Sequence, residues 1–312
     1  MKWTRILPII GLALFVYLIY TTGVRNLLDA LKHINVSLFL LSLLFIPVII
    51  LLQTYKWQIL LKQQGIQLPF MRVVIMQLKS VFYGVVTPGK IGSFIKIHYI
   101  KQASGKDVGN SAQSVILDRF LDTITVFVMA FLGAVFIIHV TRETTIIFVA
   151  VLVLIALAFY IILNKRFMKF FLGIFFKVLI SKKIKQTLQE SFETFYHNIP
   201  QTKHLLFPFL VNIVTWIIIY TAPFLIAYSL GITQIPYLAF ISMYAISTII
   251  SIIPITISGI GTREASLVGL FSIYNIPAEL TIAMSLLSFF TGTILIACIG
   301  AYLSVKNIGE TA

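Results

Sequence analysis

Charged residues are scarce in this chain, and cysteine is almost absent. Only 11% of its 312 residues are charged, whereas roughly 25% is usual in soluble domains. Hydrophobic residues make up 59%, and the mean hydropathy is +1.00. This composition excludes an ordinary soluble domain and predicts an integral membrane protein. Cys298, the one cysteine, lies in the last apolar stretch, so the sequence offers no disulfide framework and no cysteine pair for a metal.

Motifs for catalysis and for cofactors are also missing. Lys90 follows a glycine, but Ile91 stands where a P-loop requires serine or threonine. No nucleophile has a base beside it, and the histidines share no helix face. We therefore expect neither an enzyme nor a cofactor or metal. The net charge of +14 is expected to serve a membrane surface and not a nucleic acid.

Six apolar stretches are long enough to cross roughly 30 Å of hydrocarbon. They are residues 6–22, 36–58, 115–138, 144–163, 205–230 and 279–304. The first begins close behind Lys2 and Arg5, as a signal peptide does, but no small-residue cleavage motif follows it before Arg25. We interpret it as a retained helix, and the stretches together predict six spans.

Two further segments, residues 72–100 and 237–275, are apolar but are interrupted by glycine. The interruptions are Thr87–Ser93 (TPGKIGS) and Thr256–Thr262 (TISGIGT), which align without a gap at an offset of 169 residues. Proline and glycine break the hydrogen-bond ladder of a helix, and the freed groups need partners inside the membrane. The pattern predicts a duplicated chain with one re-entrant helical hairpin in each half. Two kinked ordinary spans are the alternative.

The basic residues near the span ends indicate the orientation, because lysine and arginine are retained on the cytoplasmic side. With the N-terminus inside, only Arg25, Lys32 and Arg142 of the connecting segments face outward. Both termini are then cytoplasmic, and the protein is expected to be a multi-pass protein of the cell membrane. The first hairpin enters from the cytoplasm and the second from outside, which is the inverted repeat of many alternating-access carriers. The predicted fold class is an all-α polytopic membrane protein with six spanning helices and two re-entrant hairpins.

We expect one integral membrane domain over residues 1–312. Its first half covers residues 1–164, and its second half covers residues 200–312. Residues 165–199 between them are basic at their start and then carry an apolar stripe at helical spacing. This pattern predicts an amphipathic linker in the cytoplasmic interface. The alternative is a basic anchor without specific lipid recognition.

Few ionisable residues are placed in apolar surroundings, where each costs roughly 2.5 to 3.5 kcal/mol at a span centre. They are Lys79 and Lys90 in the first hairpin, Asp118, Arg119 and Asp122 in the third span, and Arg263 and Glu264 after the second glycine segment. Asp118 and Asp122 share a helix face and need a cation between them. We expect Lys79, Lys90 or Arg263 to supply it, within one buried cluster that joins the halves.

This cluster contains one more positive residue than negative residues. It lies beside helices that are interrupted at glycine and that expose backbone N–H groups. We expect the combination to bind a phosphate through charge-assisted hydrogen bonds and the positive end of a half-helix. The candidate binding residues are Lys79, Pro88, Gly89, Lys90, Gly92, Lys96, Asp118, Arg119, Asp122, Gly259, Gly261, Arg263 and Glu264. The alternative is that the charged residues only hold the hairpins against the spans through ion pairs.

Three segments resemble the lysylphosphatidylglycerol synthase transmembrane-region family of bacterial and archaeal proteins. They are Thr87–Ser93 followed by Lys96, then Val115–Asp122 (VILDRFLD), and finally Ser258–Ala265 (SGIGTREA). The likeness covers nearly the whole chain. It implies a multispan domain with re-entrant helices that binds and translocates phospholipid-like molecules. In the aminoacyl-lipid synthases this domain is joined to a soluble transferase domain, so we expect no lipid aminoacylation by this chain alone.

The expected function is a lipid flippase or carrier that moves a phospholipid, an aminoacyl-lipid or a polyprenyl-phosphate-linked headgroup between leaflets. Its expected partners are membrane lipids that are anionic or phosphate-bearing. A separate transferase and a homodimer are both compatible with the sequence. Two other functions stay open: a noncatalytic lipid-binding scaffold for a separate transferase, and an ion-coupled transporter of a small polar solute.

Overall fold

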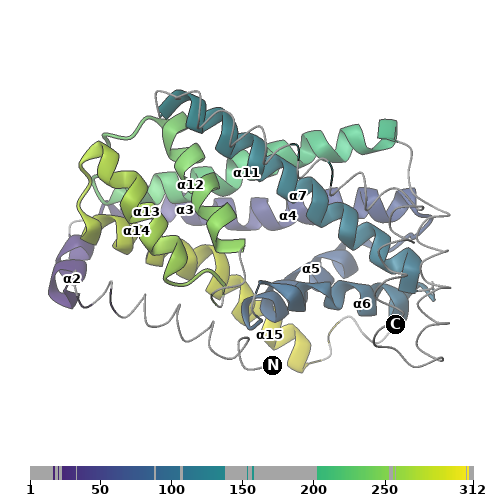
Figure 1. The fold of residues 1–312 in the computed structure, drawn as a ribbon. Helices are drawn as coiled ribbons and strands as arrows, with labels where there is room; N and C mark the ends of the chain where they lie inside the picture. Colours follow the sequence, from purple (N-terminus) through teal and green to yellow (C-terminus); the bar gives the residue numbers. More distant parts are fainter. Residues whose placement is uncertain are drawn as a thin grey trace, which may run out of the picture.

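The computed structural model describes residues 23–137 and 202–306, except for residues 33, 88, 106–107, 253–255 and 257, together with residues 17, 20, 153, 157 and 308. Every regular element in these ranges is a helix (Figure 1). The all-α prediction is therefore confirmed for this part of the chain. The expected spans 6–22 and 144–163, the linker 165–199 and both termini lie outside the described ranges.

Three helices are long and apolar enough to cross a membrane. They are Val36–Gln63, His204–Ser229 and Ala278–Val305, which coincide with the expected spans 36–58, 205–230 and 279–304. The first consists of α3 (Val36–Leu43) and α4 (Phe45–Gln63), the second belongs to α11 (Thr202–Ser229), and the third comprises α14 (Ala278–Phe289), the π-helical turn η3 (Phe290–Ile294) and α15 (Leu295–Val305). These helices indicate a membrane protein, and six spans stay a prediction.

A fourth long helix, α7 (Val108–Ile137), has 30 residues and contains most of the expected span 115–138. Before the first apolar helix lies the short α2 (Val24–Lys32). The Asn35 side chain accepts a hydrogen bond from the N–H of Leu38, which fixes the start of α3.

Each predicted hairpin segment is a pair of short helices separated at its glycine segment. In the first segment, α5 (Phe70–Val85) is followed by the 3-10 turn η1 (Ile91–Phe94) and α6 (Ile95–Ser104). In the second, α12 (Tyr237–Ile252) is followed by α13 (Thr262–Phe271) and the 3-10 turn η2 (Ser272–Tyr274). The helix breaks therefore lie where the sequence predicts them, and the paired helices have the same lengths in both segments.

The two breaks share an unusual backbone conformation. Gly89 and Lys90 have φ angles of 60° and 56°, and the residues 169 positions later, Ser258 and Gly259, have φ angles of 52° and 77°. Positive φ is uncommon outside glycine, and it costs free energy that the surrounding structure must offset. Two non-glycine residues adopt it here, one in each half. The duplication seen in the sequence therefore extends to the backbone of the breaks.

The long helices that precede the two hairpin segments run antiparallel. The N–H of Asn35, at the start of α3, donates to the carbonyl of Ser229, at the end of α11, over 2.7 Å. At the opposite end, the side chain of Gln63 donates to the carbonyl of His204 over 2.7 Å. Figure 1 shows α5 and α6 toward one end of the long helices and α12 and α13 toward the other.

Helix packing crosses between the halves. The most extensive contacts join α12 to α7, α5 to α15 and α4 to α11. Thus each short helix that precedes a break packs on the long helix that follows the other break. Val126 and Ala130 of α7 share one buried apolar cluster with Phe240 and Met243 of α12. Each half thus covers a short helix of the other half, so this packing ties the two halves together.

The contact between α5 and α15 depends on Gly300, and this makes it testable. A Cβ atom on Gly300 would lie 2.2 Å from the carbonyl oxygen of Leu78. We expect Gly300→Ala to lower the free energy of unfolding by about 1 to 3 kcal/mol, because the helices must separate. Gly269→Ala in α13 is the matched control, since a Cβ there meets nothing within 4 Å. Thermal unfolding in detergent micelles measures both, and equal melting temperatures would contradict the packing.

Candidate functional site

A buried lysine joins the two aspartates of α7. The Nζ atom of Lys56 in α4 lies 2.8 Å from Oδ1 of Asp118 and 2.6 Å from Oδ1 of Asp122. It also donates to the side-chain oxygen of Asn212 in α11 over 2.8 Å. Lys56 is 1% exposed. The cation between the aspartates was expected from Lys79, Lys90 or Arg263, and this prediction was wrong in naming them.

Lys96 completes this network from α6. Its Nζ atom donates to Oδ2 of Asp118 over 3.2 Å and lies 4.1 Å from the centre of the Trp57 ring. Both Lys96 and Trp57 are fully buried. Lys96 therefore interacts with the Asp118 carboxylate and the Trp57 ring. It does not line the cavity described below. Lys79 is also buried, with its Nζ atom 4.9 Å from the centre of the Tyr99 ring.

Asp122 stands at the edge of the network. The indole N–H of Trp216 donates to its Oδ1 atom over 3.1 Å, and the nearest nitrogen of Arg119 is 3.7 Å from its Oδ2 atom. Asn212 donates to the carbonyl of Leu121 and to the hydroxyl of Thr125. The network thus binds α4, α6, α7 and α11 together through charged and polar groups.

Lys56 was not among the predicted residues, because it lies near the end of an apolar stretch. A lysine at that place usually extends its ammonium group to the membrane surface. One signal could have identified it. Gln53, Thr54, Lys56 and Gln58 cluster within the stretch, and a helix that only faces lipid would not carry this polar group of residues.

A second ionic group lies at the start of α13. The Arg263 guanidinium pairs with Oε1 of Glu264, which also accepts a hydrogen bond from the Ser285 hydroxyl over 2.8 Å. The other carboxylate oxygen, Oε2, accepts the N–H of Gly261 over 2.7 Å and so caps the helix. The guanidinium stacks on the Phe289 ring at 4.5 Å. No hydrogen bond or ion pair among the described residues connects this group to Asp118 or Asp122, so the predicted single cluster is divided into two separately bonded groups.

The glycines of the breaks serve close packing. A Cβ atom on Gly92 would lie 2.1 Å from the carbonyl oxygen of Tyr83, and the N–H of Gly92 donates to the Thr87 hydroxyl over 2.7 Å. A Cβ atom on Gly259 would lie 2.7 Å from the Cβ atom of Ser251. The N–H groups of Gly92 and Gly261 already have partners within the chain. The expected approach of a phosphate to the Gly92 amide is therefore corrected.

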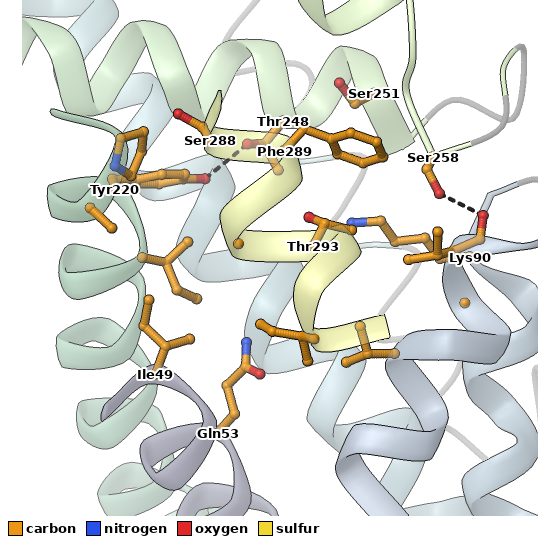
Figure 2. A pocket seen from close by; sticks show the side chains of 18 of the residues that line it. Ile49, Gln53, Lys90, Tyr220, Thr248, Ser251, Ser258, Ser288, Phe289 and Thr293 are labelled. Carbon is orange, nitrogen blue, oxygen red and sulfur yellow. Dashed lines mark hydrogen bonds between the residues drawn. The ribbon is translucent and has the colours of Figure 1, made fainter. Parts of the chain in front are cut away.

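The two breaks touch each other directly. The hydroxyl of Ser258, in the second break, donates to the carbonyl of Val85, at the end of α5, over 2.8 Å (Figure 2). This bond satisfies one of the carbonyl groups that the interrupted α5 leaves open. Gly89 contributes its positive φ angle to the first break, and Pro88 lies outside the described residues.

A cavity of about 300 Å³ opens between the two breaks and the long helices. Both halves line it. Its charged lining residues are Lys90, Arg119, Asp122 and Arg263. Figure 2 shows Lys90 extending into the cavity past Phe289 and toward Thr293. Of the predicted site residues, the structure brings Lys90, Arg119, Asp122 and Arg263 to one cavity.

The remaining cavity wall combines hydroxyl and apolar side chains with the amides of Gln53 and Gln77. The hydroxyl groups belong to Ser93, Thr248, Ser251, Ser258, Ser288 and Thr293, among others. The apolar side chains include Ile46, Ile49, Val81, Val85, Ile219 and Ile296. A cavity of this kind suits a molecule with a charged end and an apolar end.

Comparison with known proteins supports the sequence argument. The family model for the lysylphosphatidylglycerol synthase TM region matches residues 6–300. The chain belongs to this family. A UPF0104 membrane protein of Pyrococcus horikoshii is 25% identical, over 97% of this chain and 96% of its own length. A UPF0104 membrane protein of Methanothermobacter thermautotrophicus is 24% identical, over 90% of this chain and 87% of its own length.

Membership in the lysylphosphatidylglycerol synthase TM region family confirms the resemblance drawn from Thr87–Ser93, Val115–Asp122 and Ser258–Ala265. It also agrees with the apolar helices in placing this chain among membrane proteins. In the structure the first segment forms the first break. The second contributes Asp118 and Asp122 to the buried network, and the third leads from the second break into the start of α13. Each of them therefore borders the cavity or supports a residue that does.

We predict that Lys56 is the main stabilising residue of the buried network. Lys56→Met leaves Asp118 and Asp122 without their shared cation, and removing one partner of a buried ion pair costs about 3 to 5 kcal/mol. In the double variant with Asp118→Asn, the loss should be smaller than the sum of the single losses. Lys62→Met, an exposed change in the last turn of the same helix, is the control. Urea unfolding in mixed micelles measures the wild type, both single variants, the double variant and the control, and additive losses would disprove the coupling.

Proposed function

We propose that this chain is a lipid flippase or lipid carrier, which binds the headgroup of a membrane lipid in the central cavity and moves it between leaflets. The observation that carries the proposal is the cavity itself. It is formed by both halves, its charged lining is mainly cationic, and part of its wall is apolar. Its volume of about 300 Å³ suits a headgroup and not whole acyl chains, which would stay in the bilayer.

The finer architecture is part of the same proposal. We propose that the halves form an inverted repeat, with α5 and α6 re-entering from the cytoplasm and α12 and α13 from outside. Three findings support it: the matched positive φ angles at the breaks, the antiparallel course of α3–α4 and α11, and the reciprocal packing of α5 on α15 and of α12 on α7. Repeats of this kind let a fixed site face each side of the membrane in turn.

In this scheme the two breaks act as gates on opposite sides of the headgroup. Lys90 belongs to one break and Arg263 directly follows the other, and both line the cavity. Their charges offset the cost of bringing a phosphate into apolar surroundings. The Ser258 bond to the Val85 carbonyl holds the breaks together, and its opening would widen the path on one side.

The π-helical turn η3 lines the cavity with Thr291, Gly292 and Thr293, and such turns are frequent at functional sites.

No chemical step by this chain is part of the proposal. Transport changes the position of the lipid and breaks none of its bonds. An enzyme that modifies the headgroup would be a separate transferase, which is a proposed partner and not a component of the cavity.

Filling the cavity should stop transport without unfolding the protein. Gly292 lines the cavity, and a Cβ there meets nothing within 4 Å, so Gly292→Trp can place its ring in the open space. We expect liposomes with the wild-type chain to exchange a fluorescent phospholipid between leaflets faster than protein-free liposomes, and Gly292→Trp to slow this exchange at least about tenfold. Quenching of the outer leaflet by dithionite measures the exchange.

Gly269→Trp is the matched control for this experiment. Gly269 is exposed, does not line the cavity and also has open space at its Cβ position. It should exchange lipid at the wild-type rate. If the wild type exchanges phospholipids and polyprenyl phosphates no faster than protein-free vesicles, the flippase proposal fails and the scaffold for a separate transferase replaces it.

The proposed orientation is tested by cysteine labelling. Cys298 is exposed, so it is first replaced by serine. A cysteine at Gln234, in the exposed turn before α12, should then react with an impermeant reagent added to intact cells. A cysteine at Lys101, in α6, should react only after the cells are opened, because the first hairpin enters from the cytoplasm. Labelling of both positions from outside would contradict the inverted repeat.

A further inference from the structure

The buried network behind the cavity is balanced in charge. Lys56 and Lys96 supply two positive charges, and Asp118 and Asp122 supply two negative charges; Lys56 pairs with both aspartates, and Lys96 pairs with Asp118. Lys56 and Lys96 are buried, and so is Asp118. Asp122 alone reaches the cavity, and its charge is held by Lys56 and the Trp216 indole. This group therefore has little negative charge left to offer a cation in the cavity.

The second ionic group is balanced as well. Arg263 pairs with Glu264, which is fully buried and receives further hydrogen bonds from Ser285 and Gly261. The face of the guanidinium rests on Phe289. Arg263 can still contact a ligand in the cavity, but its charge is matched within the chain.

Two cations at the cavity are left without a full partner. The Lys90 side chain makes no hydrogen bond or ion pair with any residue in the described ranges, and only its backbone groups are bonded, to Thr87 and Ser93. Arg119 has only Asp122, at 3.7 Å, and Asp122 already pairs with Lys56 at 2.6 Å. The Nε atom of Arg119 is buried without a hydrogen-bond partner among the described residues. The cavity therefore carries a surplus of two positive charges.

We propose that the cavity selects a headgroup that ends in a phosphate monoester over one that contains only a phosphodiester. This rests on the proposed function, since it names the lipid class that the flippase would carry. A phosphate monoester carries two negative charges above its second pKa of about 6, and a phosphodiester carries one. The monoester also presents three terminal oxygens, whereas the phosphodiester presents two.

Hydroxyl groups of the cavity wall can donate a hydrogen bond to the third oxygen of the monoester. Ser93 and Thr293 line the cavity, and neither side chain makes a hydrogen bond with a described residue. In contrast, the hydroxyl of Ser258 already donates its hydrogen bond to the Val85 carbonyl. In Figure 2 the Lys90 side chain points toward Thr293, and both residues line the cavity. A monoester placed here would meet an ammonium group, a guanidinium group and two open hydroxyl donors.

The test is a competition between two lipids with identical acyl chains. Purified full-length chain in nonionic detergent micelles is offered equal amounts of phosphatidate, a monoester, and phosphatidylglycerol, a phosphodiester. Native mass spectrometry measures the ratio of the two that stay bound. We expect phosphatidate to be preferred by about tenfold at pH 7.5, as one additional charge-assisted contact implies.

The preference should depend on pH through the ligand. At pH 5 the monoester loses its second charge, so the ratio should fall toward one. The charged or titratable side chains that line the cavity are Lys90, Arg119, Asp122, Arg263, Tyr220 and Tyr244. No histidine is among them, and histidine is the side chain whose ordinary pKa lies in this interval.

Three variants assign the preference to the cavity. Lys90→Gln and Arg119→Gln should each lower the ratio to about threefold or less, and Lys90 breaks no described ion pair when it is replaced. Lys101→Gln removes an equal charge from an exposed site on α6 and should leave the ratio unchanged. Equal retention of both lipids by the wild type, or a preference that persists in both cavity variants, would overturn the inference.

Two further arms separate the alternatives. In the first arm, millimolar inorganic phosphate displaces phosphatidate from the wild type but not from the Lys90→Gln variant. In that case the preference for a dianion stands, and the dianion that the site takes is free phosphate. If liposomes exchange both lipids at the same rate, the headgroup preference is overturned and the flippase proposal survives. If they exchange neither, the proposed function itself fails.

Discussion

An ammonium group buried between two carboxylates cannot leave them where water is excluded, and Lys56 places α4, α7 and α11 under this constraint. Separating these helices would strand at least one charge at a cost of several kcal/mol. The remaining architecture is arranged around this fixed point. Asp122 extends from the network to the cavity wall, so the same ion pairs that hold the helices also set the electrostatic environment of the cavity.

The duplicated breaks follow from a second constraint. A helix that ends inside an apolar medium leaves backbone groups that need partners. The chain meets this need within each break and between them, through the Thr87 hydroxyl, the Glu264 carboxylate and the Ser258 hydroxyl. Lys90 and Ser258 adopt positive φ angles to close these turns. The breaks thus meet beside the cavity, and Lys90 of the first break and Arg263, directly after the second, line it.

Local sequence pattern predicted several helices of the described part of the chain. The apolar runs 36–58, 115–138, 205–230 and 279–304 correspond to long helices there, because a helix pairs all the backbone groups of a segment that lies in lipid. The offset of the two glycine segments located both helix breaks. The family followed from short motifs, because residues that need positive φ or close packing keep recognisable spacing. Four of the predicted site residues, Lys90, Arg119, Asp122 and Arg263, line one cavity.

The sequence by itself determined the helical class, the breaks and the set of charged residues that had to be accommodated. Only the tertiary structure decided which charges pair. Lys56 is 62 and 66 positions from its two aspartates, and no local pattern can measure a distance across the fold. It also decided that the N–H groups of Gly92 and Gly261 bond within the chain. Charge pairing depends on the packing of α4, α6, α7 and α11, so the surplus of positive charge at the cavity appears only once those helices are in place.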